Sequence, residues 1–414
     1  MSKLNENRPG YKKTKMGWIP RDWNFVLLSR LGQQPLINGL FKRPHEYGSG
    51  TLLVNVTDTY KGIKIDTASL GRVMTSQVEL AKYRNLCGDL FFVRSSLKLE
   101  GIGNCCVYLD DQIQSVFECH LIRFRPDQSK VDPLFAAYLF KSSKVRKQVL
   151  SFAQTTTMTT LPQGDFKRCM LPLPALPEQK KIAEILSTWD EAINQTRKLV
   201  DEKKRRKKAL MQQLLTGKKR LPGFNESWEE YRLGELFDER REVNCSHLPL
   251  LAITGTRGVI PAAEIKRKDS SSVDKSKYKR IAPGDIGYNT MRMWQGVSAV
   301  SSLEGIVSPA YTICIPKETV DVCLMGYFFK FSPVINLFRR FSQGLVSDTL
   351  NLKFNNFAQI KVKIPCLDEQ RAIAKILQAS DSEIMALKKK LATLERQKRG
   401  LMQKLLTGEV RVKI

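Results

Sequence analysis

Two long stretches of the chain carry apolar residues at spacings that alternate between four and three. In the first stretch the pattern runs through Ile182, Leu186, Trp189, Ile193, Thr196, Val200, Lys203, Lys207, Leu210 and Leu214, and in the second through Ile373, Leu377, Ser380, Ile384, Leu387, Leu391, Leu394, Lys398, Leu401 and Leu405. Such heptad spacing makes a stripe narrow enough to need one partner helix. We therefore predict two long helices that pair as an antiparallel coiled coil within the chain. A solvated single helix or a homodimeric zipper is the alternative.

The two stretches are copies of one sequence. Residues 176–217 align with residues 367–408 without a gap, and roughly 19 of the 42 aligned positions are identical. The matches include Glu178 with Glu369 and the shared ending LLTG. An antiparallel pair of near-identical helices is related by a twofold axis, so the repeat predicts pseudo-twofold symmetry.

Both copies carry signals for the start and the end of a helix. Pro177 suits a first helical turn, and Gly217 and Gly408 suit left-handed caps at the helix ends. A helix of about 40 residues is about 60 Å long. The sequence therefore predicts a rod long enough to act as a spacer.

One part of the first helix is strongly basic. The run RKLVDEKKRRKK, residues 197–208, places Lys203 and Lys207 on the heptad stripe, where a buried lysine is costly unless its charged end reaches water. Either the middle of the rod is loosely paired, or an acidic residue such as Glu395 approaches it. The outer face of the run is expected to meet DNA, an acidic partner or solvent, and the sequence leaves these three open.

The segments that flank the helices repeat more faintly. KYRNLCGDLFFVRSS, residues 82–96, resembles KYKRIAPGDIGYNTMR, residues 277–292. Short β-type runs, TLLVNVT, LFFVR, HLIRFR, PLLAIT and YTICIP, stand among Gly and Pro turns, and a helix is expected after Asp132 and Pro133. We predict an α+β fold in which two globular domains, each with a curved sheet, are separated by the two long helices. The expected bounds are 1–175 and 218–365 for the domains, and 176–217 and 366–414 for the helices.

The charge of the chain favours a polyanionic partner. Its 414 residues hold 68 Lys and Arg against 41 Asp and Glu, a formal net charge of +27. Neutralised phosphates release counterions, so nucleic acid fits this excess better than a membrane does. The longest apolar window, residues 320–338, is interrupted by Asp321, Lys330 and Pro333 and is expected to form a buried helix. No apolar core marks the N-terminus, and the nine cysteines include no CxxC, so a reduced cytoplasmic location is expected.

Motifs of catalysis are missing from the sequence. A methyltransferase acting on exocyclic amines would need an Asp/Asn-Pro-Pro-Tyr type motif, and the chain has no Pro-Pro. It also lacks the GxxxxGK[ST] loop of a translocating ATPase. Cys119 and His120 are adjacent, but no second pair at ligand spacing exists, so a core cysteine beside a strand histidine is expected. We expect neither a catalytic nor a metal site.

Several of these segments together carry a family resemblance. LPLPALPEQKKIAEIL and IPCLDEQRAIAKIL lead into the helices, LLTG ends both, and GDLFFVRSS with GIG pairs with GDIGYNTMRMWQGV and GIVSPAY. In this layout the sequence resembles the specificity subunit of type I restriction-modification systems over nearly its whole length. The resemblance implies two target-recognition domains that each read half of a split DNA site. It also implies helices that set the gap and dock two methyltransferase subunits, which restriction subunits then join. This chain would bind no cofactor, and S-adenosylmethionine would belong to the methyltransferase partner.

Two groups of residues are candidates for these contacts. The DNA-binding candidates lie in or beside loops that contain glycine or in basic clusters, and they are Arg94, Lys98, Arg257, Lys266, Arg267, Lys268, Arg292 and Gln295. The candidates for spacer and partner docking lie at the two helix starts, and they are Glu178, Gln179, Ile182, Leu186, Glu369, Gln370, Ile373 and Leu377. Each DNA candidate has the alternative of being an ordinary solvated surface residue.

Further basic and aromatic residues have alternatives of their own. A second basic cluster, formed by Lys275, Lys277, Lys279 and Arg280, is expected to meet phosphates. Trp294 is expected in the core, with stacking on a base as the alternative.

Two other classes of protein remain open at this point. A stand-alone DNA-binding coiled-coil protein would have no enzyme partner. A self-contained restriction or modification enzyme would need the motifs that the sequence lacks. We expect a non-catalytic specificity subunit.

Overall fold

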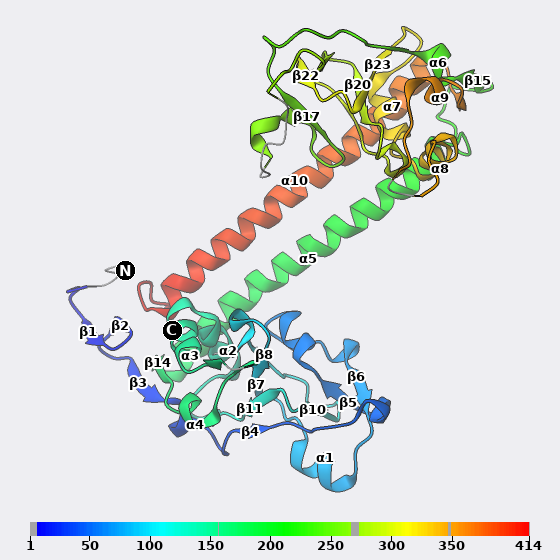
Figure 1. Ribbon diagram of the computed structural model, residues 1–414. Coiled ribbons are helices and arrows are strands. Elements are labelled where there is room, and N and C mark those ends of the chain that lie inside the picture. The colour runs from blue at the N-terminus through cyan, green and yellow to red at the C-terminus, as the bar shows by residue number, and fades with distance from the viewer. Residues whose placement is uncertain (1–5, 156, 266–272, 347–348, 414) are drawn as a thin grey trace. The chain divides into compact units, whose positions relative to one another are not determined.

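The computed structural model describes residues 6–155, 157–265, 273–346 and 349–413 (Figure 1). The chain divides into two compact units. Unit 1 comprises Met1–Thr196 and Lys390–Ile414, and unit 2 comprises Arg197–Lys389. Each unit therefore contains one globular part together with half of each long helix. The four-part division expected from the sequence counts the helices as separate segments and stays a prediction.

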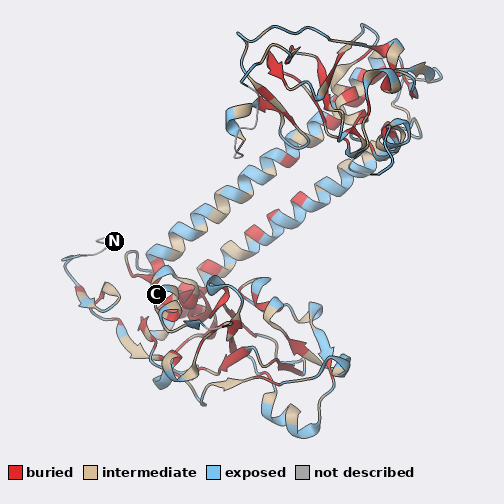
Figure 2. Ribbon diagram, viewed as in Figure 1, coloured by how far each residue is buried: buried red, intermediate tan, exposed pale blue. Residues whose placement is uncertain are grey.

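The two long helices begin and end where the repeat predicts. Helix α5 is Leu176–Leu214 and helix α10 is Leu367–Leu406. The chain turns after each helix at a glycine in the left-handed region, Gly217 with φ +68° and Gly408 with φ +69°. Both helices lie among apolar partners in their first turns and expose most of their middle turns to solvent (Figure 2). Each helix has one narrow apolar stripe at heptad spacing, and its other faces are largely polar. This distribution accounts for the exposure of the middle turns.

The helices pair antiparallel within each unit. In unit 1, Ile182 shares a core with Leu405, and the ion pair of Asp190 with Lys398 lies farther along α5 and earlier along α10. In unit 2, residues at the start of α10 share a core with Leu214, and Lys207 pairs with Asp381. The intrachain antiparallel pairing is therefore confirmed, because residue numbers rise on one helix as they fall on the other.

Unit 1 holds fourteen strands and four shorter α-helices among the residues that the structure describes. The strands are β1 Tyr11–Thr14, β2 Gly17–Pro20, β3 Asn24–Leu27, β4 Ile37–Asn38, β5 Tyr47–Val54, β6 Gly71–Val73, β7 Leu90–Val93, β8 Ser95–Ser96, β9 Cys105–Val107, β10 Ser115–Phe117, β11 Leu121–Phe124, β12 Gln154–Thr155, β13 Thr159–Thr160 and β14 Met170–Leu173. The helices are α1 Gln77–Tyr83, α2 Pro133–Lys141, α3 Ser143–Ser151 and α4 Gln163–Phe166. As expected, Asp132 caps α2, accepting a hydrogen bond from the backbone of Phe135 at 2.7 Å.

Unit 2 repeats the plan with fewer strands. Its strands are β15 Glu229–Arg232, β16 Phe237–Glu239, β17 Leu251–Thr254, β18 Gly258–Pro261, β19 Lys279–Ile281, β20 Ile286–Asn289, β21 Ser298–Val300, β22 Gly305–Val307, β23 Tyr311–Pro316 and β24 Lys361–Ile364. Its shorter helices are α6 Leu233–Leu236, α7 Val322–Phe328, α8 Ser332–Phe341 and α9 Phe354–Ala358. The predicted single helix over 320–338 is wrong, because Pro333 lies in the first turn of a second helix and the chain turns before it.

A four-stranded antiparallel sheet forms the centre of each unit. The strand order is β4-β11-β7-β9 in unit 1 and β16-β23-β20-β21 in unit 2. The remaining strands form separate sheets of two or three strands. Apart from β5 and β23, the strands have only two to four residues and are separated by turns, so they do not extend one continuous ladder. A sheet in each domain is found as expected, and its curvature stays a prediction. The α+β class itself is confirmed.

The central sheet packs on the helices that precede the long helix. In unit 1, Phe92 of β7 contacts Phe140 of α2 at a centroid distance of 4.6 Å and Phe166 of α4 at 4.8 Å, both edge to face. In unit 2, Phe237 of β16 contacts Phe329, which directly follows α7, at a centroid distance of 5.6 Å with the rings tilted. These aromatic clusters fix the sheet against the start of each long helix, which is where the repeated contacts described below lie.

Candidate nucleic-acid interface

A buried aspartate fixes the start of the same strand in both units. Asp89 precedes β7 and forms two 2.7 Å contacts with the guanidinium of Arg125. Asp285 precedes β20 and contacts Arg240 at 2.7 and 3.0 Å. Each carboxylate also accepts a backbone hydrogen bond from the residue three positions earlier, at 2.8 and 2.7 Å. These charge-assisted hydrogen bonds fix the position of the strand start in each unit. The loop that follows the other end of the strand is positioned as a consequence.

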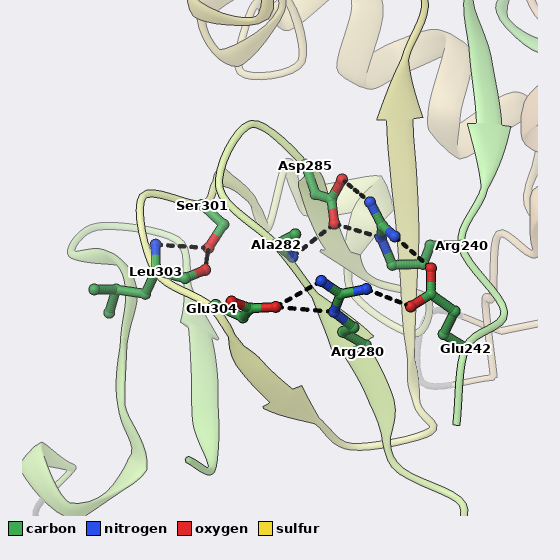
Figure 3. A network of polar contacts seen from close by, with 8 residues as sticks. All are labelled: Arg240, Glu242, Arg280, Ala282, Asp285, Ser301, Leu303 and Glu304. Atoms are coloured by element: carbon green, nitrogen blue, oxygen red, sulfur yellow. Dashed lines mark hydrogen bonds and ion pairs between the residues drawn. The ribbon is translucent and has the colours of Figure 1, made fainter. Parts of the chain in front are cut away.

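In unit 2 this ion pair extends to the surface (Figure 3). Arg240 also binds Glu242 at 2.5 Å. Arg280 binds both Glu242 and Glu304, at 2.6 Å in each case. Lys279 donates to the carbonyl of Tyr311 at 2.9 Å. Acidic and carbonyl groups of the unit itself thus satisfy Arg280 and Lys279, which argues against their predicted use on phosphates.

In unit 1, β7 leads into a loop that we call reading loop 1, residues 94–101. Arg94 is half-buried, and its backbone bonds to His120 at 2.7 Å and to Leu161 at 2.8 Å. Lys98 is exposed at the outer end of the loop. Strand β8 within the loop pairs with β13, so a Ser- and Thr-rich edge lies beside these cations. The two DNA candidates Arg94 and Lys98 therefore share one polar surface.

The corresponding loop of unit 2, reading loop 2, comprises residues 290–296. Its backbone carbonyl at Thr290 bonds to Leu352 at 2.9 Å, which matches the contact of Arg94 with Leu161. Arg292 and Gln295 are both exposed, so the structure brings these two candidates together. Trp294 is half-exposed, and its indole donates to the Met291 carbonyl at 3.0 Å. The expectation of a core tryptophan is therefore wrong.

The remaining DNA candidates lie elsewhere. Arg257 is in the turn between β17 and β18, where it is exposed and ion-paired with Glu264. Lys266, Arg267 and Lys268 lie outside the described residues.

One group of side chains has the chemistry of metal ligands. The ligand atoms of Glu118, Cys119 and His120 lie within 4.8 Å of one another, in the turn between β10 and β11. Both carboxylate oxygens of Glu118 accept backbone hydrogen bonds, one from Val56 at 3.2 Å and one from His120 at 3.4 Å. Glu118 is therefore used to bind backbone N–H groups of its own turn and of the segment that contains Val56. Partial burial raises the pKa of the Cys119 thiol. Neither Cys119 nor His120 is buried and both lie in a turn, so the predictions of a core cysteine and a strand histidine are wrong.

The helix-start candidates are used within the chain. Glu178 and Glu369 are each 1% exposed and bind Arg411 and Arg220 respectively, through pairs of contacts between 2.6 and 2.8 Å. Each glutamate thus lies at a helix N-terminus, where a negative charge is favourable, and is neutralised by an arginine that follows the end of the opposite helix.

The adjacent glutamines have an equally specific role. The side chain of Gln179 accepts from the backbone of Asp132 at 2.9 Å and donates to Pro174 at 3.0 Å. Gln370 makes the matching contacts with Asp321 at 2.9 Å and Pro365 at 2.9 Å. Both glutamines tie the helix start to the globular part. The apolar candidates of this group are also buried, and they are Ile182, Leu186, Ile373 and Leu377.

A further group of three side chains occurs once in each unit, and the sequence reasoning missed it. In unit 1, Asp190 accepts from the Tyr138 hydroxyl at 2.6 Å and from Lys398 at 2.5 Å. Lys398 also lies over the Tyr138 ring, 5.1 Å from its centroid. Burial, and then the bond to Asp190, raise the pKa of Tyr138. We call this group of three the clamp of unit 1.

The clamp of unit 2 consists of Tyr327, Asp381 and Lys207. Its contacts are 2.7 Å from tyrosine to aspartate, 2.6 Å from lysine to aspartate and 4.7 Å from lysine to ring centroid. Burial likewise raises the pKa of Tyr327. The identity of Asp190 with Asp381 in the repeat was the signal that could have found both clamps.

The clamp also explains the lysines on the heptad stripe. Lys207 pairs with Asp381, and Lys203 pairs with Glu383. The two lysines on the heptad stripe are therefore ionically paired within unit 2, by Glu383 and Asp381. Among the described residues, no helix combines the length and apolar content needed to cross a membrane.

Two α+β domains, each followed by one helix of a matched pair, define a duplicated specificity-subunit architecture. A family model for the type I restriction modification DNA specificity domain matches residues 95–201 and 225–396. The chain belongs to this family, as the resemblance predicted.

Curated relatives agree along the length of the chain. A Methanocaldococcus jannaschii protein, assigned by inference as the type I restriction enzyme MjaX specificity subunit, is 28% identical and aligns over 97% of each chain. The MjaVIII specificity subunit of the same organism is 26% identical over 67% of this chain and 70% of its own.

Solved structures show the same fold. The HsdS subunit from Thermoanaerobacter tengcongensis has a TM-score of 0.50 and 18% identity, covering 95% of this chain and 98% of its own. The type I restriction-modification S subunit from M. genitalium has a TM-score of 0.56 and 16% identity, covering 95% and 96%. Both long helices and both recognition domains of the expected fold are thereby confirmed.

Proposed function

We propose that this chain selects the DNA sequence for a type I restriction-modification complex. Unit 1 reads one half of a bipartite site and unit 2 reads the other half. The observation that carries this proposal is that the two units keep the same sheet order and the same buried contacts but place different side chains in reading loops 1 and 2. Matched scaffolds with unlike loops suit two readers of unlike sequences, and the charge of +27 suits a DNA partner.

The long helices set the gap between the half-sites and dock two methyltransferase subunits, which restriction subunits join. Four buried residues contribute to docking indirectly, because they fix the starts of the two helices: Glu178, Gln179, Glu369 and Gln370. The exposed faces of α5 and α10 then meet the partners. The chain itself is non-catalytic and works in the cytoplasm, and S-adenosylmethionine binds to the methyltransferase partner.

Genome-wide mapping of methylated adenines tests this function. The chain is expressed with the methyltransferase subunit of its own system in a host that lacks both, and modified positions are mapped. We expect one new bipartite motif, two short specified parts separated by unspecified bases. A continuous motif would contradict two readers on a spacer, and methylation of DNA by the purified chain alone would contradict the non-catalytic role.

Affinity capture of the native chain tests the partners. We expect the methyltransferase subunit to be recovered with it. If the chain binds DNA but recovers no such subunit, it is a stand-alone DNA-binding coiled-coil protein instead.

A further inference from the structure

Reading loop 1 presents a large apolar side chain to solvent. Leu97 is 85% exposed and Leu99 is 45% exposed. A single exposed leucine is common on protein surfaces and by itself indicates nothing. What distinguishes Leu97 is how firmly its loop is held and which charges surround it.

The loop is anchored on both sides of Leu97. The backbone of Lys98 donates to the Ser96 hydroxyl at 3.1 Å, which closes a tight turn around Leu97. Arg146 of α3 donates to the carbonyl of Glu100 at 2.5 Å and also binds that of Ile102. Backbone freedom is therefore low, and little conformational entropy is lost when Leu97 is buried by a partner.

Close packing at Gly101 fixes the same loop from below. A Cβ atom at this position would lie 2.4 Å from the Ser96 hydroxyl and 2.8 Å from that of Tyr60. Tyr60 also donates to the Gly101 carbonyl at 3.3 Å. The loop therefore cannot fold back to cover Leu97 without breaking contacts with its own support.

The surroundings of Leu97 are cationic and polar. Arg94 lies three residues before it and the exposed Lys98 directly after it. Within the described part of the chain, neither of these two side chains forms an ion pair. Gln154 and Thr155 of the adjoining β12–β13 hairpin are exposed as well. Leu97 is an apolar side chain between two cations. This arrangement fits a DNA duplex, which has charged phosphates on its outside and stacked bases in its interior.

Reading loop 2 has a comparable arrangement. Met291 is 41% exposed and directly precedes the exposed Arg292. Leu and Met both belong to the small set of side chains that proteins insert between base pairs to unstack and kink a duplex. The two loops share this feature although their sequences differ.

We propose that Leu97 is a wedge that enters the base stack at one step of the half-site read by unit 1. This inference rests on the proposed function. Methyltransferases act on a base that is taken out of the stack, so a step already opened by Leu97 lowers the cost of that extrusion. Arg94 and Lys98 hold the flanking phosphates while the side chain enters.

The experiment uses the complete complex of this chain with its methyltransferase subunit and a duplex that carries the mapped site. 2-Aminopurine replaces one adenine at a time, and an increase in its fluorescence reports unstacking. We expect wild type to raise the fluorescence at one step of the half-site of unit 1. Leu97→Ala should abolish that rise and weaken binding of the site by about tenfold, whereas Leu97→Met should retain most of both effects.

Lys98→Ala is the matched control. Loss of one phosphate contact should weaken binding and make the salt dependence shallower by about 0.9 in the slope of log K against log salt, with the fluorescence rise retained. Leu97→Ala should leave the thermal unfolding midpoint unchanged, because an exposed side chain contributes little to the core.

Three results would overturn the wedge. One is a wild-type complex that binds its site without a fluorescence rise anywhere in that half-site. Another is a Leu97→Ala complex that keeps the rise. The third is a Leu97→Ala chain that no longer recovers the methyltransferase subunit, which would make Leu97 a protein contact. Absence of any site-specific binding by wild type would instead count against the proposed function.

Discussion

Units 1 and 2 agree where they hold the long helices and differ where they face outward. The clamp, the glutamate–arginine pair and the glutamine contacts of one unit recur in the other with nearly the same distances. Reading loop 1 offers Arg94, Leu97 and Lys98, whereas reading loop 2 offers Arg292 and Gln295. The comparison separates residues that support the scaffold from residues that are free to specify a target.

The strand-start ion pairs sharpen this comparison. Asp89 and Asp285 occupy matching positions, but Arg125 follows β11 while Arg240 follows β16. The same buried carboxylate is therefore neutralised from a different strand in each unit. A buried carboxylate is costly unless a positive charge is paired with it. Both units therefore retain an aspartate–arginine pair, although the arginine follows a different strand in each unit.

The largest predicted effect comes from exchanging one reader. Replacing residues 14–175 with the equivalent domain of another specificity subunit should replace one half of the methylated motif completely and leave the other half unchanged. The reason is that the reading loop and its supports lie within the exchanged segment. Methylome mapping measures the outcome, with a reciprocal exchange of residues 218–365 as the control. A change in both halves would mean that the units do not read independently.

A smaller effect should follow from lengthening one helix. Four residues of high helix propensity, inserted in α5 after Thr196, add about 6 Å by helix rise. The unspecified gap should then grow by about one or two base pairs, because each pair occupies about 3.4 Å. The bases of both half-sites should stay the same.

Methylome mapping also measures this insertion. The matched control places the same four residues after Asp111, in an exposed turn before β10, where the motif should not change. Altered specified bases in the α5 variant would show that the helix is not a spacer.

The heptad pattern and the repeat were sufficient to predict both long helices, their ends at Gly217 and Gly408 and their antiparallel pairing. These features depend on local periodicity and on copies within one chain, which a sequence displays directly. The acidic partners of Lys203 and Lys207 could not be assigned, because they depend on the register between two helices far apart in the sequence.

The candidate site was less predictable than the helices. Arg94 with Lys98, and Arg292 with Gln295, lie together on loops as expected from their glycine-containing segments. The contacts of Arg280 with Glu242 and Glu304, and of Lys279 with the Tyr311 carbonyl, could not be foreseen, since these partners are distant in the sequence. The exposure of Leu97 and Trp294 was equally hidden, because side-chain direction in short irregular segments follows tertiary contacts and not periodicity.

The smallest predicted effect concerns the two clamps. Asp190→Asn removes the charge that Lys398 binds but retains an oxygen for the Tyr138 hydroxyl. We expect a loss of about 1 kcal/mol in the free energy of unfolding and a fall of about 2–4 °C in the unfolding midpoint of unit 1. Asp381→Asn should cost unit 2 less, because the Asp381 side chain is 43% exposed against 26% for Asp190 and is better screened by water.

Differential scanning calorimetry measures both clamp variants. Glu184→Gln is the matched control, since it breaks an exposed ion pair with Lys181 on the same helix and should change the midpoint very little. Equal shifts for the control and for Asp190→Asn would reduce the clamp to an ordinary surface pair. A larger shift for Asp381→Asn than for Asp190→Asn would mean that contact with the tyrosine, and not burial of the charge, sets the strength of the clamp.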